Sequence, residues 1–498
     1  NVAMGFGALD ANTTAANNTA VGYNSLTANT TGASNVSVGA GASDANTDGD
    51  SNIAVGVGAL GSDTRGNFST AIGHAALNSQ NTTNDTDMYN TAVGYLAGTL
   101  VTTGVQNTLI GGLAGDAITT GNYNTAVGIH AVGSTTTASN NTGIGYNALF
   151  ANTTGSENTA VGQGALDANT TAAGNTAVGS DALTANTTGA NNTGIGKNAL
   201  EANTTASNNT AVGKGSMLRN TTGAANTAVG FESLLVNTTG ANNTALGDNA
   251  LNVSTTASNN TAVGKSALAA NTTGTENVAV GAGALTANTT GSYNHAFGRN
   301  AGAAITTGDT NIAIGNAALG TATTADGNTA VGHSALSANT SGSSNVGVGL
   351  NVLDANTTGA NNTAVGTSAL GANTTGANNS ALGYLSLDTN TTGANNTGVG
   401  VRALQSSTTA DGNTAVGHSA LLANTTGSSN SSLGLNSLYG NTTGANNTAV
   451  GRSALQSNTT AANNVAMGYG ALQVNTTGAE NVAVGQGALD ANTTAGNN

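Results

Sequence analysis

The side chains best suited to acid–base or metal chemistry are five histidines, and they are dispersed along the chain: His74, His130, His295, His333 and His418. Catalysis and metal binding require several such groups close together. Aspartates such as Asp10, Asp44 and Asp490 are too sparse for the Asp-rich turns of calcium-binding solenoids. The stretch Gly5-Phe6-Gly7 lacks the Lys-Ser/Thr pair of a phosphate-binding loop. We therefore expect no enzyme activity, no metal site and no cofactor.

The recurring triplet Asn-Thr-Thr fits the acceptor pattern for N-linked glycosylation. The candidate asparagines are Asn12, Asn29, Asn81, Asn152, Asn169, Asn186, Asn203, Asn220, Asn237 and Asn271. Either they form an exposed rim that carries glycans, or Asn and Thr stack in polar ladders that satisfy the turns, which we favour. A third alternative is ice binding by ranks of Thr. Adjacent residues such as Thr13 and Thr14 point to different sides of an extended chain, which leaves one exposed file.

The composition excludes several classes of partner. The net charge of −14 argues against binding to nucleic acid or to anionic lipid surfaces. The chain has no cysteine, so disulfides and thiolate metal sites are excluded. No apolar run approaches the roughly 20 residues of a membrane span. The sequence begins in phase with its repeat at Asn1 and ends one residue into a new repeat at Asn498, so we interpret it as an excerpt of a longer chain.

The whole sequence is one tandem repeat with a period of seventeen; 28 of its 29 units have this length, and one unit is longer by four. With Asn1 as position 1, position 5 is Gly and position 4 is a large apolar residue in all 29 units. Position 3 is Ala, Gly or Ser in 28 units, and position 9 is Leu in 23. These columns predict a structural core that includes Val21, Gly22, Leu26, Val38, Gly39, Val55, Gly56, Leu60, Val161, Gly162 and Leu166.

A period this short, with an invariant Gly, favours an all-β parallel solenoid over helical hairpins. Val, Ile and Thr around position 4 favour extended backbone, and the Asn-Thr-Thr-Gly segment has turn chemistry. We expect each unit to form a strand, a tight turn, a second short strand near positions 8–11 and a longer turn. The units of residues 1–498 would stack as a single β-roll at about 4.8 Å per rung.

The one long unit locates the exposed edge of this coil. Its four extra residues fall around Asn81-Thr82-Thr83-Asn84, within the longer turn. Insertions are tolerated where the backbone faces solvent, so we expect this turn to be exposed and the flanking strands to stay in register. Positions 3 and 4 point to opposite faces of the strand. We expect position 3 to line the interior and position 4 to meet another copy of the chain.

Three units carry a swap that tests the core. Where position 9 is Gly, at Gly98, Gly115 and Gly302, position 12 is aliphatic, at Val101, Ile118 and Ile305. We interpret each aliphatic residue as filling the space of the missing Leu.

The motif Asn-x-Ala-Val/Ile-Gly, as in residues 52–56 and 277–281, resembles the head repeats of trimeric autotransporter adhesins. It is also similar to repeats of phage tail-fibre-like proteins. The adhesin resemblance implies a left-handed parallel β-roll, a homotrimer, and aliphatic side chains that face the trimer axis. The function that follows is an extracellular structural or adhesive fibre segment on a cell surface or virion. Alternatives are a glycosylated filament subunit or a rim that binds glycan, receptor or ice.

Overall fold

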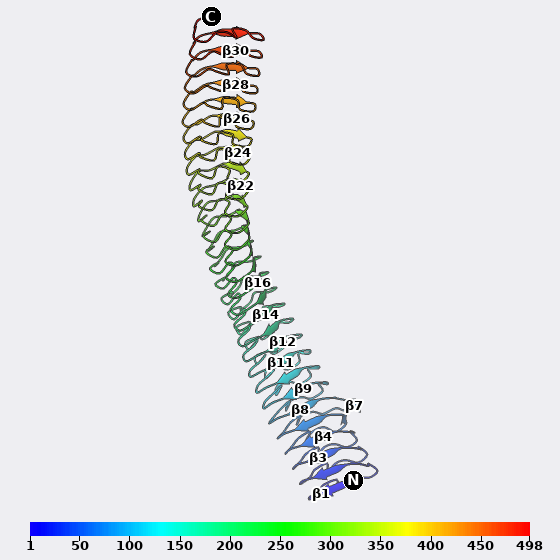
Figure 1. Cartoon of the computed structure of the whole chain (residues 1–498). Helices are drawn as coiled ribbons and strands as arrows, with labels where there is room; N and C mark the ends of the chain where they lie inside the picture. Colours follow the sequence, from blue (N-terminus) through cyan, green and yellow to red (C-terminus); the bar gives the residue numbers. More distant parts are fainter. The chain divides into compact units, whose positions relative to one another are not determined.

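The computed structural model describes residues 1–498 and contains strands and turns but no helix. The chain divides into two compact units, Asn1–Asp248 and Asn249–Asn498. In each unit, successive turns stack on one another, with one repeat of the sequence in each turn (Figure 1). Each repeat forms one three-residue strand, and two repeats of the first unit add a strand of two residues. The repeat is the same in both units, and the prediction of a single architectural unit stays a prediction.

The strands of the first unit are β1 (Val2–Met4), β2 (Thr19–Val21), β3 (Val36–Val38), β4 (Ile53–Val55), β5 (Gly66–Asn67), β6 (Thr70–Ile72), β7 (Thr86–Asp87), β8 (Thr91–Val93), β9 (Thr108–Ile110), β10 (Thr125–Val127), β11 (Thr142–Ile144), β12 (Thr159–Val161), β13 (Thr176–Val178), β14 (Thr193–Ile195), β15 (Thr210–Val212), β16 (Thr227–Val229) and β17 (Thr244–Leu246).

The strands of the second unit are β18 (Thr261–Val263), β19 (Val278–Val280), β20 (His295–Phe297), β21 (Ile312–Ile314), β22 (Thr329–Val331), β23 (Val346–Val348), β24 (Thr363–Val365), β25 (Ser380–Leu382), β26 (Thr397–Val399), β27 (Thr414–Val416), β28 (Ser431–Leu433), β29 (Thr448–Val450), β30 (Val465–Met467) and β31 (Val482–Val484).

Parallel pairing in strict register confirms the predicted β-solenoid. Apart from the two-residue strands β5 and β7, each strand covers positions 2–4 and pairs with the same positions of the neighbouring turn. Val21 lies opposite Val38, and Val38 lies opposite Val55. Like residues therefore stack over like residues along each unit, as the repeat predicts.

The second short strand predicted near positions 8–11 is wrong, because these residues form turns. Positions 7 and 9 both adopt left-handed backbone, as at Asn147 (φ 55°) and Leu149 (φ 58°). Alternating left-handed residues prevent the extended geometry of a strand. A bulky residue such as Leu rarely has positive φ, and its burial here offsets the backbone strain. The turns still bond to one another, since the Leu149 N–H donates to the Ala165 carbonyl at 2.9 Å.

The interior of each turn is built from small apolar residues, one Leu and two asparagines. Alanines at positions 3 and 8 and Leu at position 9 are buried, including the predicted core residues Leu26, Leu60 and Leu166. The other predicted core residues are half-buried at the surface of the coil: Val21, Gly22, Val38, Gly39, Val55, Gly56, Val161 and Gly162. They lie outside this interior because position 4 points away from it and position 5 forms the turn beyond it.

The aliphatic swap is confirmed. Val101, Ile118 and Ile305 are buried, and a Cβ built on Gly302 would lie 3.1 Å from Ile305 Cδ1. A further residue, Leu109, takes part in this swap, although the sequence did not predict it. Leu109, the large residue at position 3, points into the space left by Gly98 and Gly115, whose built Cβ atoms would lie 2.5 and 2.7 Å from its methyl carbons.

Two files of buried asparagine amides connect the turns. At position 1, Asn158 Oδ1 accepts the backbone N–H of Asn175 at 3.0 Å, and its Nδ2 donates to the Ala172 carbonyl at 2.9 Å. At position 12, Asn169 Nδ2 donates to Asn152 Oδ1 at 2.9 Å and to the same Ala172 carbonyl at 3.0 Å. The two files therefore donate to the same carbonyl group, that of position 15. These hydrogen bonds satisfy polar groups that would be costly to bury without a partner.

The position 12 file has gaps where Asn is replaced. Ile305 follows Asn288 and Ser407 follows Asn390 in that column. Asn288 Oδ1, Asn390 Oδ1 and Ser407 Oγ are buried without a hydrogen-bond partner. A serine hydroxyl is too short to take the place of the amide, and an isoleucine has no donor. At these two gaps the oxygen of the preceding asparagine is left unpaired.

The long unit has most of its added residues at the surface, as predicted, although Thr82 among them is buried. Asn84 and Asp85 are exposed, and the added residues extend the turn into β7, which pairs with β5. Thr70 of β6 still lies opposite Thr91 of β8, so the register resumes at once. Gln80 occupies position 12 here and accepts from Asn90 Nδ2 at 2.9 Å, which continues the amide contacts across the insertion.

The position 5 glycine is required by the stacking distance as well as by its backbone angle. Gly111 has φ 136°, and a Cβ on it would lie 2.5 Å from the Gly128 carbonyl oxygen of the next turn. A side chain there would force two backbones apart. Position 5 is therefore Gly in every unit.

We expect Gly111→Ala to disrupt the stack locally, because the new methyl group meets backbone that cannot move. Hydrogen exchange measured by mass spectrometry should show lost protection in residues 90–145. The control is the adjacent Gly112→Ala, since a Cβ on Gly112 has nothing within 4 Å. Equal loss of protection in both variants would contradict this account.

We expect Ser407→Asn to stabilise the turns around it by about 1–3 kcal/mol, because the new amide donates to the unpaired Asn390 oxygen. The readout is slower hydrogen exchange in residues 379–424. Ser406→Asn, one residue away at position 11, is the control and should give no such gain. No change in exchange for Ser407→Asn would show that the gap in the file carries no cost.

Candidate functional site

The histidines, which are dispersed along the sequence, stay apart in the structure. The five histidines lie in five different turns. His74 stacks on Tyr95, His130 meets the edge of Phe150, and His333 Nδ1 lies 3.0 Å from Ser334 Oγ. No group of three His, Asp or Glu side chains that could hold a metal ion occurs in residues 1–498. The partners of these three histidines thus lie in the same or the neighbouring turn.

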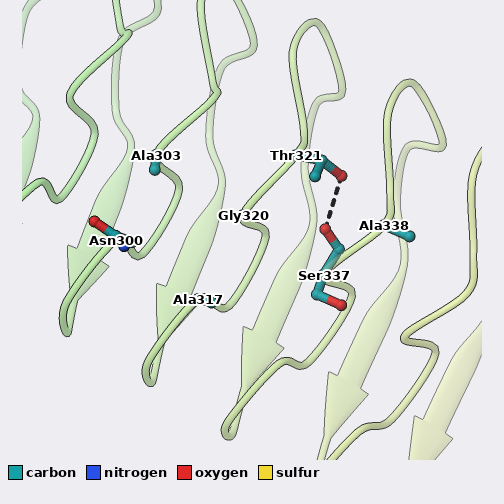
Figure 2. A pocket seen from close by; sticks show the side chains of 7 residues that line it. All are labelled: Asn300, Ala303, Ala317, Gly320, Thr321, Ser337 and Ala338. Carbon is teal, nitrogen blue, oxygen red and sulfur yellow. Dashed lines mark hydrogen bonds between the residues drawn. The ribbon is translucent and has the colours of Figure 1, made fainter.

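One depression in the surface is a gap between small side chains (Figure 2). Its volume is about 460 Å³, and it lies where positions 7, 10 and 11 of successive turns meet, lined by Asn300, Ala303, Ala317, Gly320, Thr321, Ser337 and Ala338. The Thr321 hydroxyl donates to the Ser337 carbonyl at 2.7 Å. The lining contains no charged side chain.

Burial corrects the glycosylation interpretation for most of the predicted asparagines. Fully buried in the position 12 file are Asn29, Asn152, Asn169, Asn186, Asn203, Asn220, Asn237 and Asn271. Their amides make the file described above, so the alternative of polar ladders holds for them. Asn12 is half-buried in the first turn, and Asn81 is exposed because the long unit shifts it to position 13.

The acceptor pattern is nevertheless exposed at a position that our sequence analysis missed. Position 17 is often Asn and is followed by Asn-Thr, as in Asn191-Asn192-Thr193 and Asn395-Asn396-Thr397. Asn191 and Asn395 are exposed, in left-handed backbone with φ 58° and 59°. The Asn-Asn-Thr triplets were visible in the sequence, but nothing in the sequence alone showed which asparagine is buried.

The two threonines of the triplet differ, as predicted. The hydroxyl at position 13 donates to the next turn, as Thr153 Oγ1 does to the Thr170 carbonyl at 3.0 Å. The neighbouring Thr154 at position 14 is exposed. The structure therefore has one exposed file of threonines per unit.

The strongest candidate for an interaction surface is the outer face of the strands, where position 4 forms a file of half-buried and exposed apolar side chains. We call this file the apolar stripe. In the second unit it consists of Val263, Val280, Phe297, Ile314, Val331, Val348, Val365, Leu382, Val399, Val416, Leu433, Val450, Met467 and Val484. Leu382 and Leu433 are 51% and 50% exposed. Contiguous exposed apolar surface of this kind marks interaction sites.

Aromatic side chains extend the stripe at position 6. Phe6 and Tyr23 stack with their ring centroids 5.7 Å apart, and Tyr146, Tyr384 and Tyr469 are about half exposed. Aromatic residues are enriched where proteins meet one another. Exposed aromatic surface therefore lies in the turn that directly follows the strand and its apolar residue.

Carboxyl groups with a raised pKa lie elsewhere on the coil. Partial burial raises the pKa of Asp44, Asp116, Asp167, Asp354 and Asp388, all at position 10. Asp63 occupies position 12, where Asn is usual, and burial raises its pKa as well, although hydrogen bonds from Gln80 and the backbone oppose the shift. A carboxylate in the amide file costs stability when it is charged.

Comparison with known proteins finds no family model and no curated protein that matches the chain. No helix able to cross a lipid bilayer is present in residues 1–498. The resemblance to adhesin head repeats therefore stays a prediction, and function has to be argued from the surface itself.

We expect Asp63→Asn to stabilise turns 52–90 at pH 7 and to change little at pH 3. Because the pKa of Asp63 is raised in the folded state, the folded protein loses stability as the pH rises from the unfolded-state pKa through the folded-state pKa. Removing the charge therefore increases the free energy of unfolding only above that range. Hydrogen exchange at both pH values is the measurement. Glu157→Gln, an exposed carboxyl, is the control; an equal gain at pH 3 and pH 7 would contradict the linkage.

Proposed function

We propose that this chain is a structural or adhesive segment of an extracellular fibre, on a cell surface or a virion, and that it assembles side by side with copies of itself. The observation that carries the proposal is the apolar stripe. An aliphatic file repeated at every turn has no packing partner within the chain. A second copy offers a surface with the same periodicity.

The division of the strand into two faces supports this proposal. Where position 3 is Ala, it is buried in all but the first turn, whereas the large apolar residue at position 4 is half-buried or exposed. A surface that only met water would tolerate polar residues, as position 6 just beyond the strand does with Gln163, Lys197 and Asp248. The restriction of position 4 to apolar residues in all 29 units favours a covered face.

The resemblance to adhesin head repeats supports an extracellular location and three copies per assembly. This support is independent of the apolar stripe. The stripe favours side-by-side packing but does not set the number of chains. A structural role also suits a chain whose polar groups mainly bond turn to turn.

Replacing Leu382 and Leu433 by Glu should weaken self-association by more than about tenfold, because each copy would bring two charges into an apolar interface. Mass photometry and sedimentation velocity on the whole chain give the stoichiometry. Gln405→Glu with Gln456→Glu adds the same charge at position 10, outside the stripe, and should leave assembly unchanged. A wild-type chain that stays monomeric at all accessible concentrations would refute side-by-side assembly.

A further inference from the structure

The charged residues of the second unit are sorted to opposite sides of the apolar stripe. All four of its basic residues, Lys265, Arg299, Arg402 and Arg452, lie at positions 6–7, which follow the strand. Five of its eight acidic residues lie at positions 16–17, which precede the next strand: Glu276, Asp309, Asp326, Asp411 and Glu480. The other three, Asp354, Asp388 and Asp490, lie at position 10. We call the four basic residues at positions 6–7 the cationic margin, and the five acidic residues at positions 16–17 the acidic margin.

Both margins are exposed and well placed to meet another molecule. Arg299 and Arg402 are exposed and form no ion pair within the chain. A salt bridge in the first unit joins Arg65 and Asp48. The carboxylates are held in position by one oxygen. Asp309 Oδ1 accepts the Ser292 N–H at 2.7 Å, and Asp411 Oδ1 accepts the Ala394 N–H at 2.7 Å. The second oxygen of each remains available for a cation.

We propose that ion pairs between the two margins of neighbouring copies set a parallel, in-register arrangement of the assembled chains. This inference rests on the proposed side-by-side assembly and goes beyond it, because it specifies which surfaces meet and at which turn. The occupant of the stripe is a second copy of this chain, and charge complementarity between the margins is the argument.

Symmetry decides which margins meet. When two copies pack through their stripes and are related by rotation about an axis parallel to the stack, the cationic margin of one faces the acidic margin of the other at the same turn. When the rotation axis runs along the strands, the copies are antiparallel and like margins face each other. Like charges brought together across an interface are costly, so the charge pattern selects the parallel arrangement.

Two turns carry both halves of such a contact. Arg299 and Asp309 belong to the turn at 294–310, and Arg402 and Asp411 belong to the turn at 396–412. Within one chain the strand and its flanking residues separate the members of each pair. In a parallel, in-register assembly, the arginine of one copy would face the aspartate of the same turn in its neighbour.

Charge reversal with rescue tests the inference on the whole chain. One variant carries Arg299→Asp and Arg402→Asp, a second carries Asp309→Arg and Asp411→Arg, and a third carries all four changes. We expect each of the first two to weaken self-association about tenfold in low salt, and the third to recover to within about threefold of the wild type. Sedimentation velocity gives the association constants, and Gln405→Arg with Gln456→Arg controls for added charge outside the margins.

The outcomes separate the two proposals. A monomeric wild-type chain would overturn side-by-side assembly and this inference together. An assembling wild type whose reversed variants behave like the control, or whose fourfold variant is not rescued, would overturn the margin contacts and leave the assembly proposal standing. Stronger association of the first variant would show that like margins meet, which would overturn the parallel arrangement.

Discussion

The structure depends on the hydrogen bonding of asparagine amides that are buried between successive turns. A coil this short, with a single strand of three residues, has few backbone groups in regular sheet pairing. The amides at positions 1 and 12 supply the missing donors and acceptors, and they converge on the position 15 carbonyl. Because each amide bonds both within its own turn and to the next, the same contact closes a coil and stacks it.

This polar interior explains why so few bulky residues suffice. One Leu and two Ala per turn provide a narrow apolar core, and the rest of the interior is hydrogen-bonded amide and backbone. The large aliphatic residues are thereby left for the outside of the strand. The residues that stabilise the single chain and those that offer a surface for assembly thus occupy different positions of the repeat.

Much of the fold could be predicted from the sequence because repetition makes side-chain roles comparable within one chain. The parallel register, the small residues at position 3, the exposed long turn and the partnership of Gly302 with Ile305 follow from period and volume. The second strand was predicted wrongly because the left-handed backbone at positions such as Asn147 and Leu149 has no clear signature in residue type. Polar ladders were favoured over a glycosylated rim for asparagines such as Asn152 and Asn203, but the Asn-Thr-Thr pattern does not show by itself that their amides are buried. The apolar stripe was foreseen from position 4, whereas the two charged margins became visible only when the turns were aligned in space.

The restored register after the long unit has a consequence for how such a chain changes over generations. Since every turn contacts only its immediate neighbours, gaining or losing one whole copy of the repeat leaves all remaining contacts intact. Recombination between similar repeats would therefore alter reach in discrete increments, while both ends keep the same interfaces. Length is a quantity that such a lineage can tune without redesigning its architecture.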